Sequence, residues 1–171
     1  RISEGGLKNI HGTPYYSAFE ACVQSVMASF NSWNGVKMHG HEYLLTDVLR
    51  DQMGFNGLVV GDWNGHGEVP GCTNANCPES FNAGVDIYMA PDEWKELYTN
   101  TVRAVKSGDI SEDRLDDAVR KILTVKDRLG MLDGRKPHEY ENYVGKIEHR
   151  ELAREAVSKS LVLLKNNDNL L

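Results

Sequence analysis

The feature that most constrains this chain is a short apolar run ending on an acid, within residues 54–64, GFNGLVVGDWN. Three apolar residues at 58–60 follow one another without polar alternation, which is typical of a strand buried on both faces of a parallel sheet. Parallel strands are joined by helical crossovers, so the indicated fold class is α/β. The run ends at Asp62, and Trp63 follows it.

The position of Asp62 at the end of a strand makes it a candidate for chemistry. In a barrel of parallel strands and outer helices, reactive groups lie where the strands finish. A carboxylate beside an indole can attack the anomeric carbon of a sugar while the ring forms an apolar wall. Such an acid can equally cap the next helix or form a surface ion pair, and the spacing alone leaves these readings open.

The length of the chain indicates part of a barrel. A complete eightfold barrel needs about 250 residues, whereas this chain has 171 and offers about three strand-helix units. With 40% hydrophobic and 26% charged residues the composition is that of an ordinary globular chain. The first residue is Arg1, with no initiator methionine or signal-peptide core, so we expect a mature or truncated start within a larger enzyme.

Charge and hydropathy exclude two classes of partner. The net charge is −6 with acidic and basic residues interspersed, so no basic stripe indicates a nucleic-acid partner. No apolar run approaches the roughly 18 residues of a membrane span.

The cysteines leave one question open. Cys72 and Cys77 either close a small disulfide loop in an oxidising compartment or remain free thiols. Zinc is disfavoured because no second ligand pair has usable spacing, and we expect no metal or cofactor. Cys22 falls in a helical pattern and is expected to be buried.

Several polar residues have both a functional and a structural reading. His39 and His41 lack a nearby carboxylate or cysteine that would complete a metal site, so structural or rim roles are favoured. In the long loop after Trp63, His66 and Glu68 are expected to be solvated rather than to touch a sugar. Asp86 lies near the start of a strand, away from the catalytic edge, and is expected to be structural.

The expected elements follow from periodicity and from helix-ending residues. Residues 1–13 are assigned no regular structure, and residues 64–78 are expected to form a loop that walls the pocket. Strands are predicted at 25–30, 58–60, 85–90 and 160–164, and helices at 14–22, 42–53, 78–83, 92–106, 111–129 and 149–159.

Three blocks together resemble glycoside hydrolase family 3, the retaining β-glucosidases and exo-β-glucanases. They are residues 27–39 (MASFNSWNGVKMH), residues 54–63 (GFNGLVVGDW) and residues 149–166 (HRELAREAVSKSLVLLKN). The resemblance implies the C-terminal part of a TIM-like (β/α)8 barrel in residues 1–130, a linker in 131–147 and the start of a second α/β domain in 148–171.

The resemblance also implies roles for individual residues. Asp62 matches the family's nucleophile, and Trp63 its aromatic wall beside the adjoining subsite. Phe30 stands where many members have tyrosine, and Met89 either lines the pocket or belongs to the barrel core. In multidomain members the acid/base glutamate belongs to the second domain, and a Lys-His pair and an arginine upstream bind the terminal sugar.

The implied substrate is a β-linked glucan or oligosaccharide that loses glucose from its non-reducing end, although residues 1–171 alone are expected to be inactive. A non-catalytic glycan-binding module, a β-xylosidase and an N-acetylhexosaminidase are the alternatives. Trp63 argues against the last, because those members carry a second acid there. We expect a periplasmic or secreted bacterial protein, since no Asn-x-Ser/Thr sequon supports a eukaryotic secreted origin.

Overall fold

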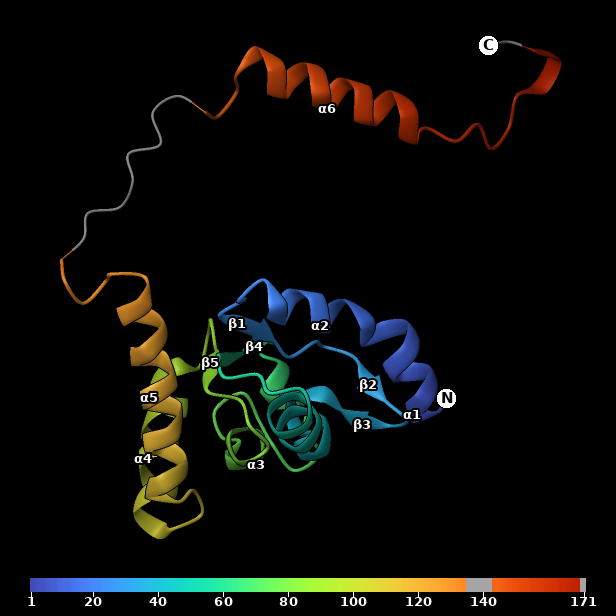
Figure 1. Cartoon of the computed structure of the whole chain (residues 1–171). Helices are drawn as coiled ribbons and strands as arrows, with labels where there is room; N and C mark the ends of the chain where they lie inside the picture. Colours follow the sequence, from blue (N-terminus) through green and yellow to red (C-terminus); the bar gives the residue numbers. More distant parts are fainter. Residues whose placement is uncertain (135–142, 170–171) are drawn as a thin grey trace. The chain divides into compact units, whose positions relative to one another are not determined.

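A computed structural model describes residues 1–134 and 143–169, which fall into two compact units. The first unit is Arg1–Gly134 and the second is Arg135–Leu171 (Figure 1). The predicted linker is in part outside the described residues, because 135–142 lie within it, and the predicted domain boundaries stay predictions. None of the described helices is both long and apolar enough to cross a membrane.

The first unit is built on a three-stranded parallel sheet, so the α/β expectation is confirmed. The strand order is β1-β4-β5, with bounds Ser25–Met27, Leu58–Trp63 and Ile87–Met89. The central strand β4 is flanked on both sides, and Val59 is completely buried in it. Because all three strands run parallel, their carboxyl ends lie along one edge of the sheet.

Strand β4 is longer than the predicted apolar run, and its pairing is irregular. It continues to Trp63, and its register with β5 shifts between Val60 and Trp63, as in a β-bulge. The other two predicted strands are shorter than expected. β1 lacks residues 28–30 of the prediction and β5 lacks residues 85, 86 and 90, although the N–H groups of Ala28 and Asp86 still donate to carbonyl groups of β4.

Helices cover the sheet and bury two apolar clusters. The first cluster lies between the sheet and the helix η3 (Tyr43–Gln52), and Phe19 of α2 (Thr13–Glu20) stacks on Phe55 beside it. The second lies where α3 (Pro78–Asn82), α4 (Trp94–Ser107) and α5 (Glu112–Arg128) meet. The buried residues are Ala28, Leu45, Leu49, Phe55, Val59 and Val85 in the first cluster, and Phe81, Ala104, Ile110 and Ala118 in the second.

The amino-terminal segment corrects two expectations. Residues 1–13, predicted to be irregular, contain α1 (Glu4–Gly6) and η1 (Leu7–His11), and α2 (Thr13–Glu20) follows. Ser3 starts this helical segment because its hydroxyl accepts the Gly6 N–H, although the two glycines masked the pattern. Cys22 is exposed rather than buried, because α2 ends at Glu20 and Cys22 turns at φ 60°.

Four short elements complete the first unit near the carboxyl ends of the strands. β2 (Ser32–Trp33) and β3 (Val36–Lys37) form an antiparallel hairpin. The 3-10 helices η2 (Met38–Gly40) and η4 (Gly65–Glu68) follow the hairpin and β4, respectively.

The second unit has one long helix and no strand in its described part. Helix α6 (Ile147–Ser160) covers the predicted 149–159, and η5 (Asn167–Asn169) follows it. The predicted strand at 160–164 is wrong: Ser160 ends the helix, and each apolar side chain of 161–164 is at least 61% exposed. A strand requires a neighbour for its backbone hydrogen bonds, and no described residue pairs with this segment.

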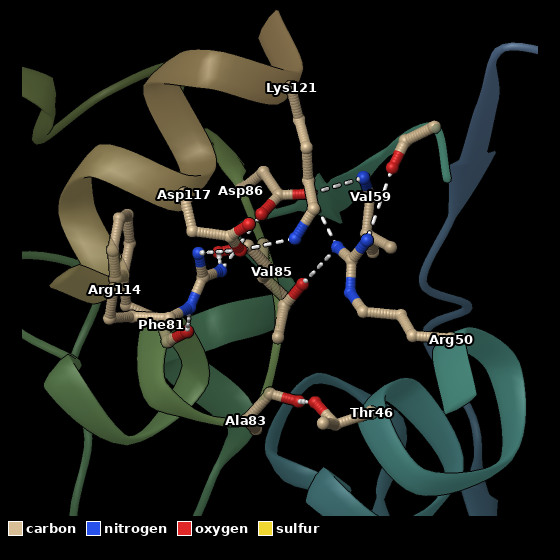
Figure 2. A network of polar contacts seen from close by, with 12 residues as sticks. Thr46, Arg50, Val59, Phe81, Ala83, Val85, Asp86, Arg114, Asp117 and Lys121 are labelled. Carbon is tan, nitrogen blue, oxygen red and sulfur yellow. Dashed lines mark hydrogen bonds and ion pairs between the residues drawn. The ribbon is translucent and has the colours of Figure 1, made fainter. Parts of the chain in front are cut away.

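A buried ion network at the start of β5 ties four elements together (Figure 2). The Asp86 side chain is fully buried and lies 2.6 Å from Arg50 of η3 and 2.9 Å from Arg114 of α5. Its Oδ2 also accepts the backbone N–H of Val59 in β4 at 2.8 Å. Asp86 is therefore structural, as predicted, and lies at the end of the sheet opposite Asp62.

Candidate active site

The carboxyl end of β4 presents Asp62 and Trp63 at the edge of the sheet. Asp62 is half-buried, whereas the Trp63 side chain is 60% exposed. The Oδ1 atom of Asp62 accepts the backbone N–H of Trp63 at 2.7 Å. One carboxylate oxygen is therefore held by the neighbouring backbone, and the acid sits beside an accessible aromatic face.

The backbone of Asp62 is held by a buried histidine. The N–H of Asp62 donates to Nε2 of His39 at 2.7 Å, and His39 is 2% exposed. Burial lowers the pKa of His39 below its usual value, while the Asp62 carboxylate acts in the opposite direction and both His66 and Lys37 lower it further. The favoured neutral ring has a lone pair with which Nε2 accepts this hydrogen bond.

The long loop after β4 contains a buried histidine, which its polar, glycine-rich composition does not predict. His66 is 1% exposed, so its prediction as a solvated residue is wrong. Its Nε2 lies 2.8 Å from the carbonyl oxygen of Asn74, and its ring packs at 4.9 Å on Tyr88 of β5. One hydrogen-bond partner and an aromatic face make up for the hydration that His66 gives up on burial.

A disulfide closes the end of this loop. Cys72 and Cys77 are bonded, which answers the question that their spacing left open. The carboxylate of Glu79 lies near both sulfurs, but the disulfide removes the thiolates that would bind a metal. The hydroxyl of Tyr88 donates to the Cys77 carbonyl at 2.5 Å, and burial raises the pKa of Tyr88. The loop is thereby fixed to β5.

The other predicted site residues lie on neighbouring elements of the same edge. Met89 of β5 is the register partner of Trp63, and its carbonyl accepts the N–H of Asn64. Met89 is partly exposed, so it is not sealed in the core.

Phe30 follows β1 and is 45% exposed, with the Lys37 ammonium 5.5 Å from its ring centre. Lys37 in turn lies 3.2 Å from exposed Glu68, and this ion pair joins the β2-β3 hairpin to the long loop. These contacts place Phe30 on the hairpin side of the edge.

The sequence predicts Asp62 as a site residue but not the histidine that bonds to its backbone. His39 and His41 are both buried, as a structural role requires, but only His39 bonds to Asp62, whereas Nδ1 of His41 accepts the Leu44 N–H at 3.4 Å. The available signal was a pair of glycines around the acid, Gly61 and Gly65, whose missing side chains leave space for the His39 ring.

Comparison with known proteins gives a consistent result. Residues 1–125 match the model of the glycosyl hydrolase family 3 N terminal domain. The structure of exo-1,3/1,4-β-glucanase ExoP from a Pseudoalteromonas species is 51% identical to this chain, with a TM-score of 0.85, and the match covers 99% of this chain and 22% of that one.

Two curated relatives extend the comparison. A β-xylosidase of Formosa agariphila is 36% identical, over 99% of this chain and 25% of its own length. A periplasmic β-glucosidase of Salmonella typhimurium is 34% identical, over 96% of this chain and 23% of its own length. The chain spans about a quarter of the length of these relatives.

Proposed function

This chain belongs to glycoside hydrolase family 3, and from that premise we propose that it carries the nucleophile of a retaining β-glucosidase or exo-β-glucanase. The observation that carries the proposal is Asp62 itself. Asp62 is half-buried at the carboxyl edge of a parallel sheet, beside exposed Trp63. A sugar that stacks on this indole brings its anomeric carbon within reach of the carboxylate.

The proposed reaction proceeds in two displacements. An oxygen of Asp62 attacks the anomeric carbon of the terminal glucosyl unit while the aglycone oxygen leaves with a proton from an acid/base carboxyl group. Water, deprotonated by the same group, then attacks the glycosyl ester, releases glucose and restores the Asp62 carboxylate with net retention of configuration. In this proposal the acid/base glutamate comes from the second domain, and Phe30, Trp63 and Met89 line the sugar site.

Covalent labelling tests the nucleophile directly. An activated 2-deoxy-2-fluoro-β-glucoside is expected to inactivate the full-length protein and to leave a fluoroglucosyl group on the peptide that contains Asp62. Asp92 provides a matched control, because it is an exposed acid that follows β5 and accepts a hydrogen bond from the Asn64 side chain.

The Asp62→Asn variant is expected to take no label and to lose turnover, while Asp92→Asn still labels at Asp62. Labelling of another residue, or normal turnover by Asp62→Asn, contradicts the assignment. The second outcome would favour a non-catalytic glycan-binding module.

A β-xylosidase is the second candidate, because the relative from Formosa agariphila bears that name. The two substrates differ by one hydroxymethyl group. A ratio of kcat/KM values for matched aryl glucosides and xylosides distinguishes them, and a higher value for the glucoside is expected.

An extracytoplasmic location is part of the proposal. Disulfides persist in oxidising compartments, the loop beside the site contains one, and one relative is a periplasmic enzyme. Reporter fusion or cell fractionation of the native host tests the location, and recovery of the protein only from the reducing cytoplasm would contradict it.

A further inference from the structure

We infer that His39 is a positioning residue that sets the geometry of the nucleophile through the backbone of Asp62. This inference rests on the proposed function, because it assumes that Asp62 reacts with the sugar. His39 contacts the main chain of Asp62 and not the reacting carboxylate oxygen, so it acts through another residue.

The first support is the irregular pairing of β4 at this point. The register of β4 with β5 shifts between Val60 and Trp63, and Asp62 lies inside the irregular segment. Bulges near active sites turn a side chain away from the regular alternation of the strand. There the N–H of Asp62 donates to the imidazole of His39.

The second support is the space made for the ring. A Cβ atom at Gly65 would lie 2.2 Å from Cε1 of His39, and one at Gly61 would lie 3.4 Å from its Cδ2. A side chain at position 65 is therefore incompatible with the ring. The residues on both sides of Asp62-Trp63-Asn64 thus leave room for an imidazole whose Nε2 points at one N–H group.

The third support is the continuity of the contacts from the ring to the carboxylate. His39 fixes the N–H of Asp62, and the next N–H along the chain, that of Trp63, holds Oδ1. Displacement of the backbone by a fraction of an ångström therefore moves the carboxylate as well. Errors of about 1 Å in the placement of a reacting group can lower the rate by about a hundredfold.

The protonation state of His39 is part of this arrangement. A proton on Nε2 would turn the acceptor into a donor that faces another donor, the Asp62 N–H. The charged and titratable groups that act on the ring are Asp62, His66 and Lys37; the first favours the proton, and the other two, together with burial, oppose it. The neutral ring that positioning requires is thus the form that burial favours.

The test compares three variants in the full-length protein. His39→Leu removes the acceptor and puts an apolar side chain of similar length in its place. His39→Gln places an amide oxygen near the position of Nε2 and so restores an acceptor. His41→Gln is the matched control, because His41 is also buried, two residues away, and bonds to Leu44 instead of Asp62.

For His39→Leu we expect kcat and the rate of fluoroglucoside labelling at Asp62 to fall by about ten- to a hundredfold, with KM changed less than about threefold. His39→Gln is expected to recover at least half of that loss on a logarithmic scale, and His41→Gln to label at the wild-type rate. Wild-type labelling by His39→Leu, or no recovery by a folded His39→Gln, overturns the inference.

If His39→Leu does not fold, the inference is tested by comparing the labelling rates of His39→Gln and His41→Gln. A fall in the labelling rate of His41→Gln as large as that of His39→Gln overturns the inference. The proposed function fails separately, by the absence of label on Asp62 in the wild-type protein.

Discussion

Replacement of Asp86 by alanine is expected to destabilise the strand that carries the proposed nucleophile and to leave the chemistry intact. The Asp86 side chain is fully buried, and its partners Arg50 and Arg114 have side chains only 12% and 15% exposed. Removal leaves two largely desolvated guanidinium groups without their carboxylate and the Val59 N–H without its acceptor. Arg50 keeps carbonyl acceptors at Gly57 and Gly84, so the arginine donors are not all orphaned.

The expected loss follows from these contacts. Breaking a buried ion pair costs about 3–5 kcal/mol, and an unpaired buried N–H costs about 1–3 kcal/mol. Because backbone carbonyls retain part of the arginine hydrogen bonding, we expect a total near the middle of the first range, about 4 kcal/mol. At 1.4 kcal/mol per factor of ten, this loss raises the opening equilibrium of β4 by roughly a thousandfold.

Hydrogen exchange measures this local opening in the full-length protein. Peptides that cover β4 are expected to exchange much faster in Asp86→Ala than in the wild type, with kcat per folded molecule changed less than about twofold. Asp117→Ala is the matched control, since Asp117 contacts the same Arg114 but its side chain is 40% exposed, and exposed pairs contribute about 1 kcal/mol or less. Unchanged exchange in Asp86→Ala, or equal effects of the two variants, would refute the reasoning.

Four further predictions concern other parts of the chain. Trp63→Ala is expected to raise KM about tenfold, or about 1.4 kcal/mol, with little change in melting temperature because the ring is 60% exposed; an unchanged KM contradicts its role as a sugar wall. The double variant Cys72→Ser, Cys77→Ser opens a six-residue loop and is expected to lower the free energy of unfolding by about 2 kcal/mol, by the loop-entropy relation. Faster protease cleavage within 64–78 than in the wild type is the expected result. Burial lowers the pKa values of His39 and His41 in the folded state, so the unfolded chain takes up protons first as the pH falls below about 6.5. The stability that the two neutral histidines contribute is therefore fully present above that pH and is lost below it. Each His→Gln variant is expected to flatten the acid side of a plot of melting temperature against pH. Residues 1–171 expressed alone are expected to hydrolyse no unactivated β-glucan, and turnover comparable to that of the full-length protein would contradict this expectation.

The sequence predicted the features that depend on local pattern. The apolar run at 58–60, the amphipathic stripes of α4 and α5 and the position of Asp62 all follow from periodicity and from the rule that chemistry lies at strand ends. Helix α5 lies within the predicted 111–129, and the Ser111 hydroxyl accepts the Arg114 N–H at its start. Each of these features is decided by neighbours in the chain.

The features that were missed depend on residues far apart in sequence. His66 is hydrophilic and lies in a glycine-rich loop, and only its contacts with Asn74 and Tyr88 explain its burial. His39 approaches Asp62 across 23 residues, a contact that helical or strand periodicity does not encode. The segment 161–164 shows the opposite case, because a continuous apolar run produced no strand where the described residues provide no strand partner.

The Asp86 network also bears on how such a protein can change over evolutionary time. Val59, which the network holds, and Asp62 lie three residues apart on one strand, or about 10 Å at the usual rise per residue. Mutations that reshape the proposed sugar pocket therefore fall on loops beyond one end of β4, while the ion cluster holds its other end. If the proposed function holds, a lineage can exchange one glycoside preference for another and still keep the ion cluster that supports the strand of Asp62.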